Sequence, residues 1–363
     1  MEDEEYSDDG EIGRQLRLEK MRAQMKQGGG DDSENGDRDQ DMVAEVLDFE
    51  DVQGQVSQWI QRTEVTRWIR KTFMHFLRNY KDESSGSSVY EERIRDMCSN
   101  NKQSLEITFT HLSSKYPTIA IWLAEEPSLM LPVLNEVSLE VTLELFPDYY
   151  MIHSTIFARI KDLPVEDQLR DLRMVHMNSL IKIRGVVTKR TGVFPEYSKI
   201  FYRCGCGDIK GPIYHSNAFE GKQFLGQCVV CQSNGPFTVD EVNTVYRNYQ
   251  KMTIQETPGT VPPGRVPRQK EVYVLNDMVD TARPGDEVEI TGIYINRFDY
   301  FSNVKHGFPV FSTIIEANYI RRFGDEDIIE LTEEDKQVIR DLARQPNIGR
   351  KIVNSIAPSI YGH

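Results

Sequence analysis

The chain has 363 residues, of which 39% are hydrophobic and 10% aromatic, so it is long enough for two or three domains with buried cores. No apolar run reaches the length of a membrane helix, and the N-terminus lacks the basic and apolar segments of a secretory signal. Five cysteines, four of them clustered, favour a reducing compartment over a disulfide-stabilised secreted protein. We therefore expect a protein of the cytosol or nucleus without a membrane partner.

The net charge of −14 is concentrated at the N-terminus. Residues 1–50 hold 17 acidic and 6 basic side chains, whereas residues 180–322 hold 18 basic and 14 acidic ones. Residues 1–45 have few large apolar side chains, so they cannot bury enough apolar surface to offset the entropy cost of ordering. We predict a disordered acidic tail there, which serves either as a solubilising segment or as an arm for a basic partner such as histones.

Residues 46–165 are predicted to form a helical domain. Three segments place apolar residues at the spacings of three and four that a half-buried helix requires: 56–80, 89–101 and 127–146. We interpret the aromatic stripe of the first segment, including Trp68 and Phe73, as core. Cys98 is interpreted as a core residue and not as a nucleophile.

After Asn178 the pattern changes to short strands separated by Gly/Pro turns, which is typical of a small barrel. The strand-like segments are 180–194, 197–204, 244–257, 270–280, 286–298 and 309–320. Gly185 and Gly192 are predicted bulge or bend positions. We assign residues 166–322 to the barrel domain, with an insertion at 200–240. Residues 323–363 are expected to be helical, with Thr332 as an N-cap.

The insertion contains two close cysteine pairs, Cys204 with Cys206 and Cys228 with Cys231, which 21 residues separate. Thiolates at such spacing bind zinc, and the metal replaces a core that about 40 residues cannot build alone. We predict a structural zinc bound by all four cysteines in a ribbon of two hairpins. C-x-C is a less common zinc turn than C-x-x-C, so His215 is an alternative ligand to Cys204. A redox dithiol and an unmetallated cluster are the other interpretations.

Basic and aromatic side chains alternate on the barrel strands, which suits single-stranded nucleic acid, because cations follow the phosphates while rings stack on bases. The candidate DNA contacts are Lys189, Arg190, Arg247, Lys251, Arg297 and Lys305. The last two belong to a predicted hairpin at about 295–312. The alternative is a solvated basic face, and the small basic excess predicts weak binding by a single chain.

Enzymatic motifs are missing from these residues. There is no G-x-x-x-x-G-K-[ST] phosphate loop, no G-x-S-x-G and no H-E-x-x-H. His306 has no nucleophile or carboxylate at a recognisable spacing. We assign no catalytic residue, and the sequence leaves open whether the complete protein is an enzyme.

The order of these segments resembles the N-terminal half of the minichromosome maintenance (MCM) family of replicative helicase subunits, and within it the eukaryotic subunit-two branch. The resemblance covers roughly residues 45–363. It is carried by YEERIRDMC, LIKIRGVVTKRTGVFP, QCVVCQSNGPF, YRNYQKMTIQETPG, VPPGRVPRQKEVYVLNDMVD, RPGDEVEITGIY, HGFPVF and IAPSIYGH. The subunit-two branch usually has C-x-x-C in its first cysteine pair, so the C-x-C of this chain departs from it.

The resemblance implies a multidomain α+β fold: a helical bundle, an OB-type β-barrel with an inserted zinc ribbon, and a helical linker to an AAA+ ATPase domain that these residues do not include. It implies a heterohexamer of MCM subunits that encircles DNA in the nucleus and unwinds it during DNA replication. ATP and Mg²⁺ would be bound by the full-length protein. The loop carrying Arg265 and Arg268 would signal to the ATPase tier, and 295–312 would be a hairpin in the ring channel.

Two other functions compete with this one. The first is a stand-alone OB protein that binds single-stranded DNA and carries a structural zinc. The second is a histone-binding scaffold in which the acidic tail of residues 1–45 is the main functional element. The ring neighbours and the strandedness of the DNA are not determined by the sequence.

Overall fold

A computed structural model describes residues 56–81, 88–214, 226–257, 259–261, 264–298, 311–323, 333–344 and 347–356. Residue contacts divide the chain after Arg322 into two units, which are taken separately below. The predicted acidic tail, His215, Lys305 and Thr332 lie outside the described residues. Within them, no helix combines the length and apolarity needed to cross a lipid bilayer.

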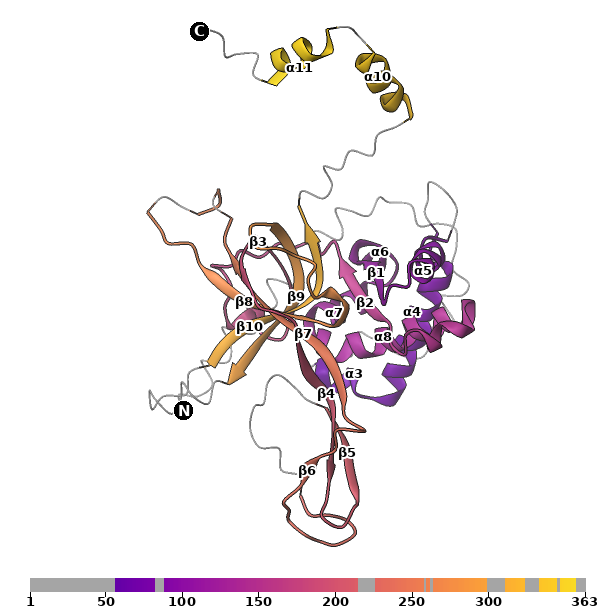
Figure 1. Cartoon of the computed structure of the whole chain (residues 1–363). Helices are drawn as coiled ribbons and strands as arrows, with labels where there is room; N and C mark the ends of the chain where they lie inside the picture. The colour runs from indigo at the N-terminus through magenta and orange to yellow at the C-terminus, as the bar shows by residue number, and fades with distance from the viewer. Residues whose placement is uncertain are drawn as a thin grey trace, which may run out of the picture. The chain divides into compact units, whose positions relative to one another are not determined.

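The first part of the larger unit is mainly helical (Figure 1). Its helices are α3 (Val56–Ile60), α4 (Thr63–Asn79), α5 (Val89–Ser99), α6 (Phe109–Lys115), α7 (Pro117–Glu125) and α8 (Pro127–Leu145), followed by the 3-10 turn η2 (Pro147–Met151). The apolar stripe predicted at 56–80 is confirmed as core, because Ile69, Phe73 and Phe76 are buried. The predicted helix is interrupted after Ile60, so α3 and α4 are separate. Cys98 is half-buried at the edge of this core.

This helical domain also contains a two-stranded parallel sheet that the sequence analysis did not predict. β1 (Ser104–Thr108) pairs with β2 (Phe157–Lys161) in register from Ser104 opposite Phe157 to Thr108 opposite Lys161. Each strand has only five residues, which is too short for alternation to stand out between helical segments. The expectation of a purely helical bundle was therefore wrong for these two segments.

The second part is a barrel-like sheet of eight strands. They are β3 (Leu180–Arg190), β4 (Phe194–Arg203), β5 (Ile209–Tyr214), β6 (Thr238–Val239), β7 (Val245–Gln255), β8 (Gln269–Leu275), β9 (Glu287–Phe298) and β10 (Phe311–Arg322). The order is β3-β9-β10-β8-β7-β4-β5, and an added pairing of β3 with β7 closes five of them into a ring. The predicted strands are thus confirmed. Short 3-10 turns precede β3 (η3, Met174–His176) and follow β8 (η4, Asn276–Met278).

Closure of the barrel requires a glycine at residue 185. A Cβ atom on Gly185 would lie 2.5 Å from the carbonyl oxygen of Gln255 on β7, where the two strands cross. The register between β3 and β7 also shifts between Val187 and Lys189. The predicted bend at Gly185 is therefore a close approach of two backbones, which no side chain could occupy.

A bulge in β10 directs the side chain of Asn318 toward the helical domain. The pairing of β10 with β9 shifts between Ala317 and Tyr319, which leaves Asn318 as the extra residue. Gly292 on β9 accommodates the bulge, because a Cβ atom there would lie 2.5 Å from the carbonyl oxygen of Glu316. The Asn318 amide accepts a hydrogen bond of 2.7 Å from the Ile160 backbone N–H and donates one of 3.0 Å to the Ala158 carbonyl.

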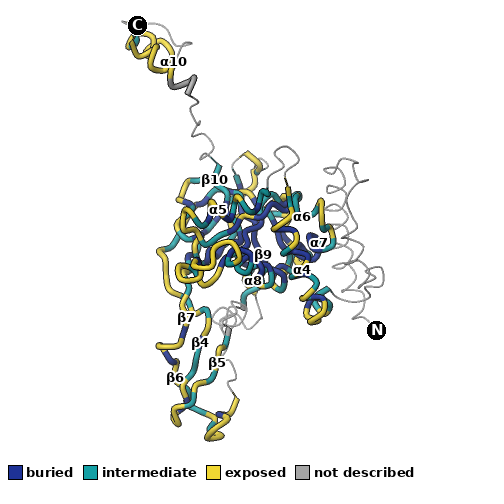
Figure 2. The backbone as a smooth tube through the Cα atoms, turned by 90° about the vertical axis from the view of Figure 1, so that its right-hand side faces the viewer, coloured by how far each residue is buried: buried dark blue, intermediate teal, exposed yellow. Residues whose placement is uncertain are grey.

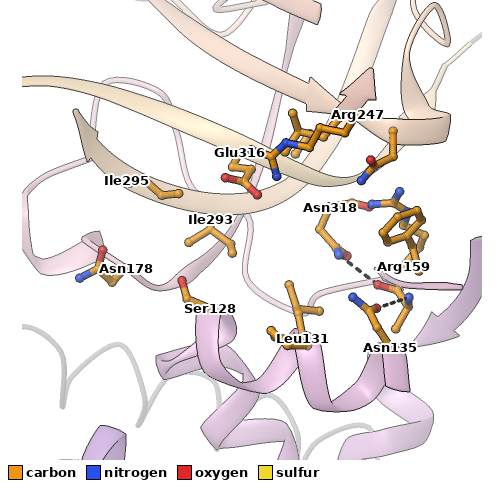
Figure 3. A pocket seen from close by; sticks show the side chains of 16 residues that line it. Ser128, Leu131, Asn135, Arg159, Asn178, Arg247, Ile293, Ile295, Glu316 and Asn318 are labelled. Carbon is orange, nitrogen blue, oxygen red and sulfur yellow. Dashed lines mark hydrogen bonds between the residues drawn. The ribbon is translucent and has the colours of Figure 1, made fainter. Parts of the chain in front are cut away.

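The outer edge of β2 is thereby covered by side chains instead of another strand (Figure 3). Asn135 of α8 accepts a 2.7 Å hydrogen bond from the backbone N–H of Ala158, beside the two bonds made by Asn318. Three successive backbone groups of one edge thus have partners, as buried peptide groups require. The helical domain and the barrel are joined by this edge.

Arg159 makes a second set of polar contacts between the helical domain and the barrel. Its side chain is buried, donates 3.1 Å from Nη1 to the Asn318 carbonyl, and donates 2.9 Å from Nε to Ser104 Oγ. Its remaining nitrogen, Nη2, pairs with Asp277 of η4, which also accepts from the Ser104 hydroxyl. The guanidinium is therefore saturated by groups from β1, η4 and β10, which compensates the cost of burying its charge. Asn135, Arg159, Asn318, Asp277 and Ser104 are called the polar junction below.

The smaller unit contains two helices in its described residues. These are α10 (Glu333–Ala343) and α11 (Ile348–Ile356). The described side chains of α10 are exposed, and Ile352 and Val353 of α11 are exposed as well. The helical prediction for this part of the chain is confirmed over these two segments.

Replacing Asn318 with alanine leaves the buried N–H of Ile160 and the carbonyl of Ala158 without partners. We expect N318A to lower the free energy of unfolding by about 2–4 kcal/mol, since each unpaired buried group costs about 1–3 kcal/mol. Urea denaturation monitored by tryptophan fluorescence measures this change. Asn296→Ala on β9 is the matched control, because its Oδ1 is buried without a hydrogen-bond partner. Equal losses in both variants would contradict the assigned role of Asn318.

Candidate metal centre and nucleic-acid face

Strands β4, β5 and β6 form an arm that extends from the barrel (Figure 1), and the four clustered cysteines lie in the segments that connect these strands. Strand β4 leaves the barrel wall, where it pairs with β7, and continues into the arm, where it pairs with β5 and β6. Burial falls along the arm, which is mostly half-buried or exposed (Figure 2). We call the described residues 198–214 and 226–244 the cysteine arm.

Each cysteine pair sits in a tight turn at the far end of this arm. Cys204 follows β4, and its backbone N–H donates to the Asp208 carbonyl at 2.8 Å, which closes the turn into β5. Cys228 donates in the same way to the Ser233 carbonyl at 2.9 Å. Cys204 and Cys228 are buried, whereas Cys206 and Cys231 are exposed.

The four sulfur atoms converge between these two turns. Cys204 Sγ lies 3.4 Å from Cys231 Sγ, and Cys206 Sγ lies 3.7 Å from Cys228 Sγ. All four Sγ atoms lie within 4.8 Å of one another. A tetrahedral zinc with Zn–S distances of about 2.3 Å separates its sulfurs by roughly 3.8 Å, so the four side chains fit this ion. The C-x-C turn brings its sulfurs to the cluster as the C-x-x-C turn does.

The local backbone favours a thiolate at Cys204. A hydrogen bond from the backbone N–H of Cys206 lowers the pKa of the Cys204 thiol to about 7. Burial and hydrogen bonds with the other cysteines raise the pKa of Cys206 and Cys228, so Cys204 is the thiol of these three that ionises most readily. The structure gives no comparable information for His215, the alternative ligand, which lies outside the described residues.

The base of the arm is held by a buried carboxylate, Asp240. It accepts hydrogen bonds from Asn243 Nδ2 at 2.6 Å and from Arg203 Nη2 at 2.9 Å. Its backbone N–H donates to the Phe201 carbonyl at 2.8 Å, and its carbonyl accepts from the Thr244 hydroxyl at 2.7 Å. The hydrogen bonds from Asn243 and Arg203 hold the pKa of Asp240 below its usual range. All of these contacts are made by side chains and backbone groups of the arm itself.

The predicted DNA contacts lie on three strands, and several are paired with carboxylates. Arg190 Nη1 lies 3.0 Å from Asp280, Arg247 Nε lies 2.9 Å from Glu196, and Lys251 Nζ lies 2.6 Å from Glu271. Arg297 on β9 donates to the Tyr273 hydroxyl. Lys189 at the end of β3 is exposed, and no described carboxylate forms an ion pair with it. The structure does not place Lys305.

Two protein-family models match this chain, one over the helical domain and one over the barrel. Residues 70–162 match the model of the MCM N-terminal domain, and residues 168–298 match that of the MCM OB domain. The chain belongs to the MCM family. The OB match includes the whole cysteine arm and the paired cations on β3, β7 and β9.

Several relatives named as MCM proteins are longer than this chain and are similar to it over part of their length. The chain is 50% identical over 317 residues to the DNA replication licensing factor MCM2 of Arabidopsis thaliana, covering 86% of this chain and 34% of that protein. Identity to the factor mcm2 of Schizosaccharomyces pombe is 45% over 316 residues, or 85% and 38%. Identity to the minichromosome maintenance protein MCM of Saccharolobus solfataricus is 33% over 301 residues, or 81% and 43%. The chain thus spans less than half the length of these relatives.

In the MCM OB domain, the loop between β7 and β8 carries Arg265 and Arg268. Its base is closed by Glu256, which is buried and accepts from Arg170 Nε at 2.9 Å and Nη2 at 2.7 Å. Glu256 also accepts from the Arg268 backbone N–H at 3.0 Å, and Arg268 Nη1 donates to the Arg170 carbonyl at 3.0 Å. Hydrogen bonding to Arg170 lowers the pKa of Glu256. Arg268 is thus held at the base of the loop, while Arg265 is exposed.

A cleft of about 590 Å³ lies between the two MCM domains (Figure 3). Its lining combines three residues of the polar junction, Asn135, Arg159 and Asn318, with the apolar side chains Leu131, Ile293 and Ile295. Arg247 and Glu316 line the barrel side of the cleft. The predicted DNA contact Arg247 therefore lies next to the junction of the two domains.

Sequence reasoning missed the acidic side chains that surround the predicted cations. Glu196, Glu271 and Asp280 are unremarkable in the sequence, because their partners are set by the register between strands. Alternation along β4 was the one signal in the sequence. It places the side chains of Phe194 and Glu196, two residues apart, on the same face of the strand. No sequence pattern indicated the structural role of Asp240.

Replacing Asp240 with asparagine tests the base of the arm. We expect D240N to lower hydrogen-exchange protection of the amides of Asp240 and Thr244 at pH 7. Because the folded pKa of Asp240 is lowered, the carboxylate stabilises the fold above its unfolded pKa of about 3.9, and this effect is lost as the pH falls through the folded value. The difference between the wild type and D240N should therefore shrink below about pH 4. An unchanged difference at low pH would exclude Asp240 ionisation as its cause.

Proposed function

We propose that this chain is the N-terminal tier of an MCM helicase subunit of the MCM2 type, which encircles DNA and contributes to ring assembly during DNA replication. The observation that carries the proposal is the order of two MCM domains with a four-cysteine arm inserted in the second. The relatives named DNA replication licensing factor MCM2 support the assignment to this branch.

The proposed domain organisation follows the sequence analysis. Residues 1–45 form an acidic tail, 46–165 the helical domain, 166–322 the OB barrel, and 323–363 a linker toward an ATPase domain. The tail is the proposed site of histone contacts. ATP and Mg²⁺ would be bound beyond this chain, where the family's ATP-driven unwinding would take place. Other MCM subunits are the proposed ring partners, and the nucleus is the proposed location.

We further propose that the cysteine arm is a structural zinc ribbon with Cys204, Cys206, Cys228 and Cys231 as ligands. The convergence of their sulfurs within 4.8 Å supports this set. Zinc would link the two turns of an arm in which few apolar side chains are buried. The backbone hydrogen bonds of Cys204 and Cys228 hold the two turns, and zinc would add the link between them.

Zinc content tests this ligand set. The purified chain should bind about one zinc per molecule, as measured by elemental analysis, and Cys204→Ala should lose most of it. Cys98→Ala is the matched control, because Cys98 lies in the helical domain and should leave the zinc content unchanged. If C204A retained one zinc, Cys204 would not be a ligand, and a His215→Ala variant would then test the alternative.

DNA binding tests the role of the barrel. Fluorescence anisotropy with a labelled dT oligonucleotide should show weak binding that falls steeply with salt. Lys189→Ala should lower the affinity several-fold and reduce the salt slope by about 0.7, the value for one phosphate contact of a single strand. Lys102→Ala, an exposed lysine of the helical domain, is the control and should bind as the wild type does. Equal effects of the two variants would argue against a specific role for Lys189.

A further inference from the structure

Strand β7 presents a cation, a ring and a second cation along one face. Arg247, Tyr249 and Lys251 are two residues apart, so they point to the same side of the sheet. Glu196 on β4 and Glu271 on β8 flank this row. We call these five residues the β7 face.

Both cations of the β7 face are neutralised by neighbouring strands. Glu196 is the direct cross-strand partner of Arg247, and their side chains are 19% and 20% exposed. Glu271 opposes Thr253 and reaches Lys251 diagonally, with side chains 45% and 34% exposed. The face therefore carries no net charge where the sequence shows two cations.

Tyr249 lies between the two carboxylates. Its ring stands edge-on to Tyr273, with centroids 5.2 Å apart. Burial raises the pKa of Tyr249, Tyr273 raises it further, and the charges of Glu196 and Glu271 both add to the shift. Along β7, the Tyr249 side chain lies between Arg247 and Lys251, so the two ion pairs are neighbours on one face of the sheet.

We propose that Glu196 and Glu271 compete with the phosphates of single-stranded nucleic acid for Arg247 and Lys251. A carboxylate and a phosphate oxygen are alternative acceptors for the same cation. The more exposed pair of Lys251 and Glu271 contributes little net stability, so a phosphate can displace its carboxylate. The pair of Arg247 and Glu196 is more buried, so there the phosphate has to replace the carboxylate as the partner of the arginine. Binding is then an exchange of anions, and its affinity is set by the two glutamates as much as by the two cations. This inference rests on the proposed DNA-binding function.

The glutamine variants test the competition directly. Glu196→Gln and Glu271→Gln each remove one competitor while keeping the shape of the side chain. We expect each to raise affinity for a labelled dT oligonucleotide by about three- to ten-fold at 50 mM salt, and to steepen the salt slope toward one more phosphate contact, about 0.7. The gain should shrink as salt rises, because the phosphate contacts themselves weaken.

Glu106→Gln is the matched control. Glu106 pairs with Lys161 at 3.2 Å in the helical domain, so the variant makes the same charge change and also leaves a lysine without its partner. We expect it to change the affinity by less than about two-fold, since Glu106 pairs with a lysine that does not belong to the β7 face. A second control, R247Q in the E196Q background, should abolish the gain of E196Q.

The possible outcomes separate this inference from the proposed function. An equal gain in E106Q, E196Q and E271Q would show an effect of net charge alone and would overturn the competition. Unchanged affinity in E196Q and E271Q, with measurable binding by the wild type, would also overturn it while leaving the proposed function intact. No binding by the wild type or any variant would overturn both. Glu271 is the more exposed of the two, so E271Q keeps the test valid if E196Q lowers the melting temperature.

Discussion

The larger unit depends on one buried arginine and one bulged asparagine. Arg159 is charged and buried, and it is compensated only because Ser104, Asp277 and the Asn318 carbonyl all converge on it. The Asn318 carbonyl and amide reach this position because β10 carries one extra residue there. Removing a single partner leaves a buried polar group unpaired, so the loss of one contact destabilises the others. The barrel and the helical domain are therefore coupled by a network in place of a continuous sheet.

Ion pairs give the surface of the OB domain a less positive charge than its basic residues alone suggest. Its basic residues are distributed over β3 and β7 as a nucleic-acid protein would have them, yet Asp280, Glu196 and Glu271 offset three of them.

Regular spacing explains which features the sequence could predict. Alternation located β3, β7 and β9, and two cysteine pairs located a metal-type cluster, since both signals are periodic or local. The parallel pair β1 and β2 escaped because five-residue strands between helices leave too little pattern. The bulge at Asn318 and the ion pair of Arg247 escaped for another reason. They depend on strand register, which sequence-distant contacts determine and which no local pattern contains.

Strand β4 belongs to two structures at once. Near its start Glu196 faces Arg247 on the barrel, and just after its end Cys204 reaches the sulfur cluster, eight residues away or about 26 Å at 3.3 Å per residue. The pairing of β4 with β7 shifts between Tyr197 and Lys199, which leaves Ser198 as an extra residue, and the pairing with β5 shifts again between Ile200 and Tyr202. Strict alternation therefore does not run from Glu196 to Cys204. The bulge at Ser198 changes which side of β4 faces its neighbours, so removing that one residue would turn the cysteine end of the strand relative to the barrel end.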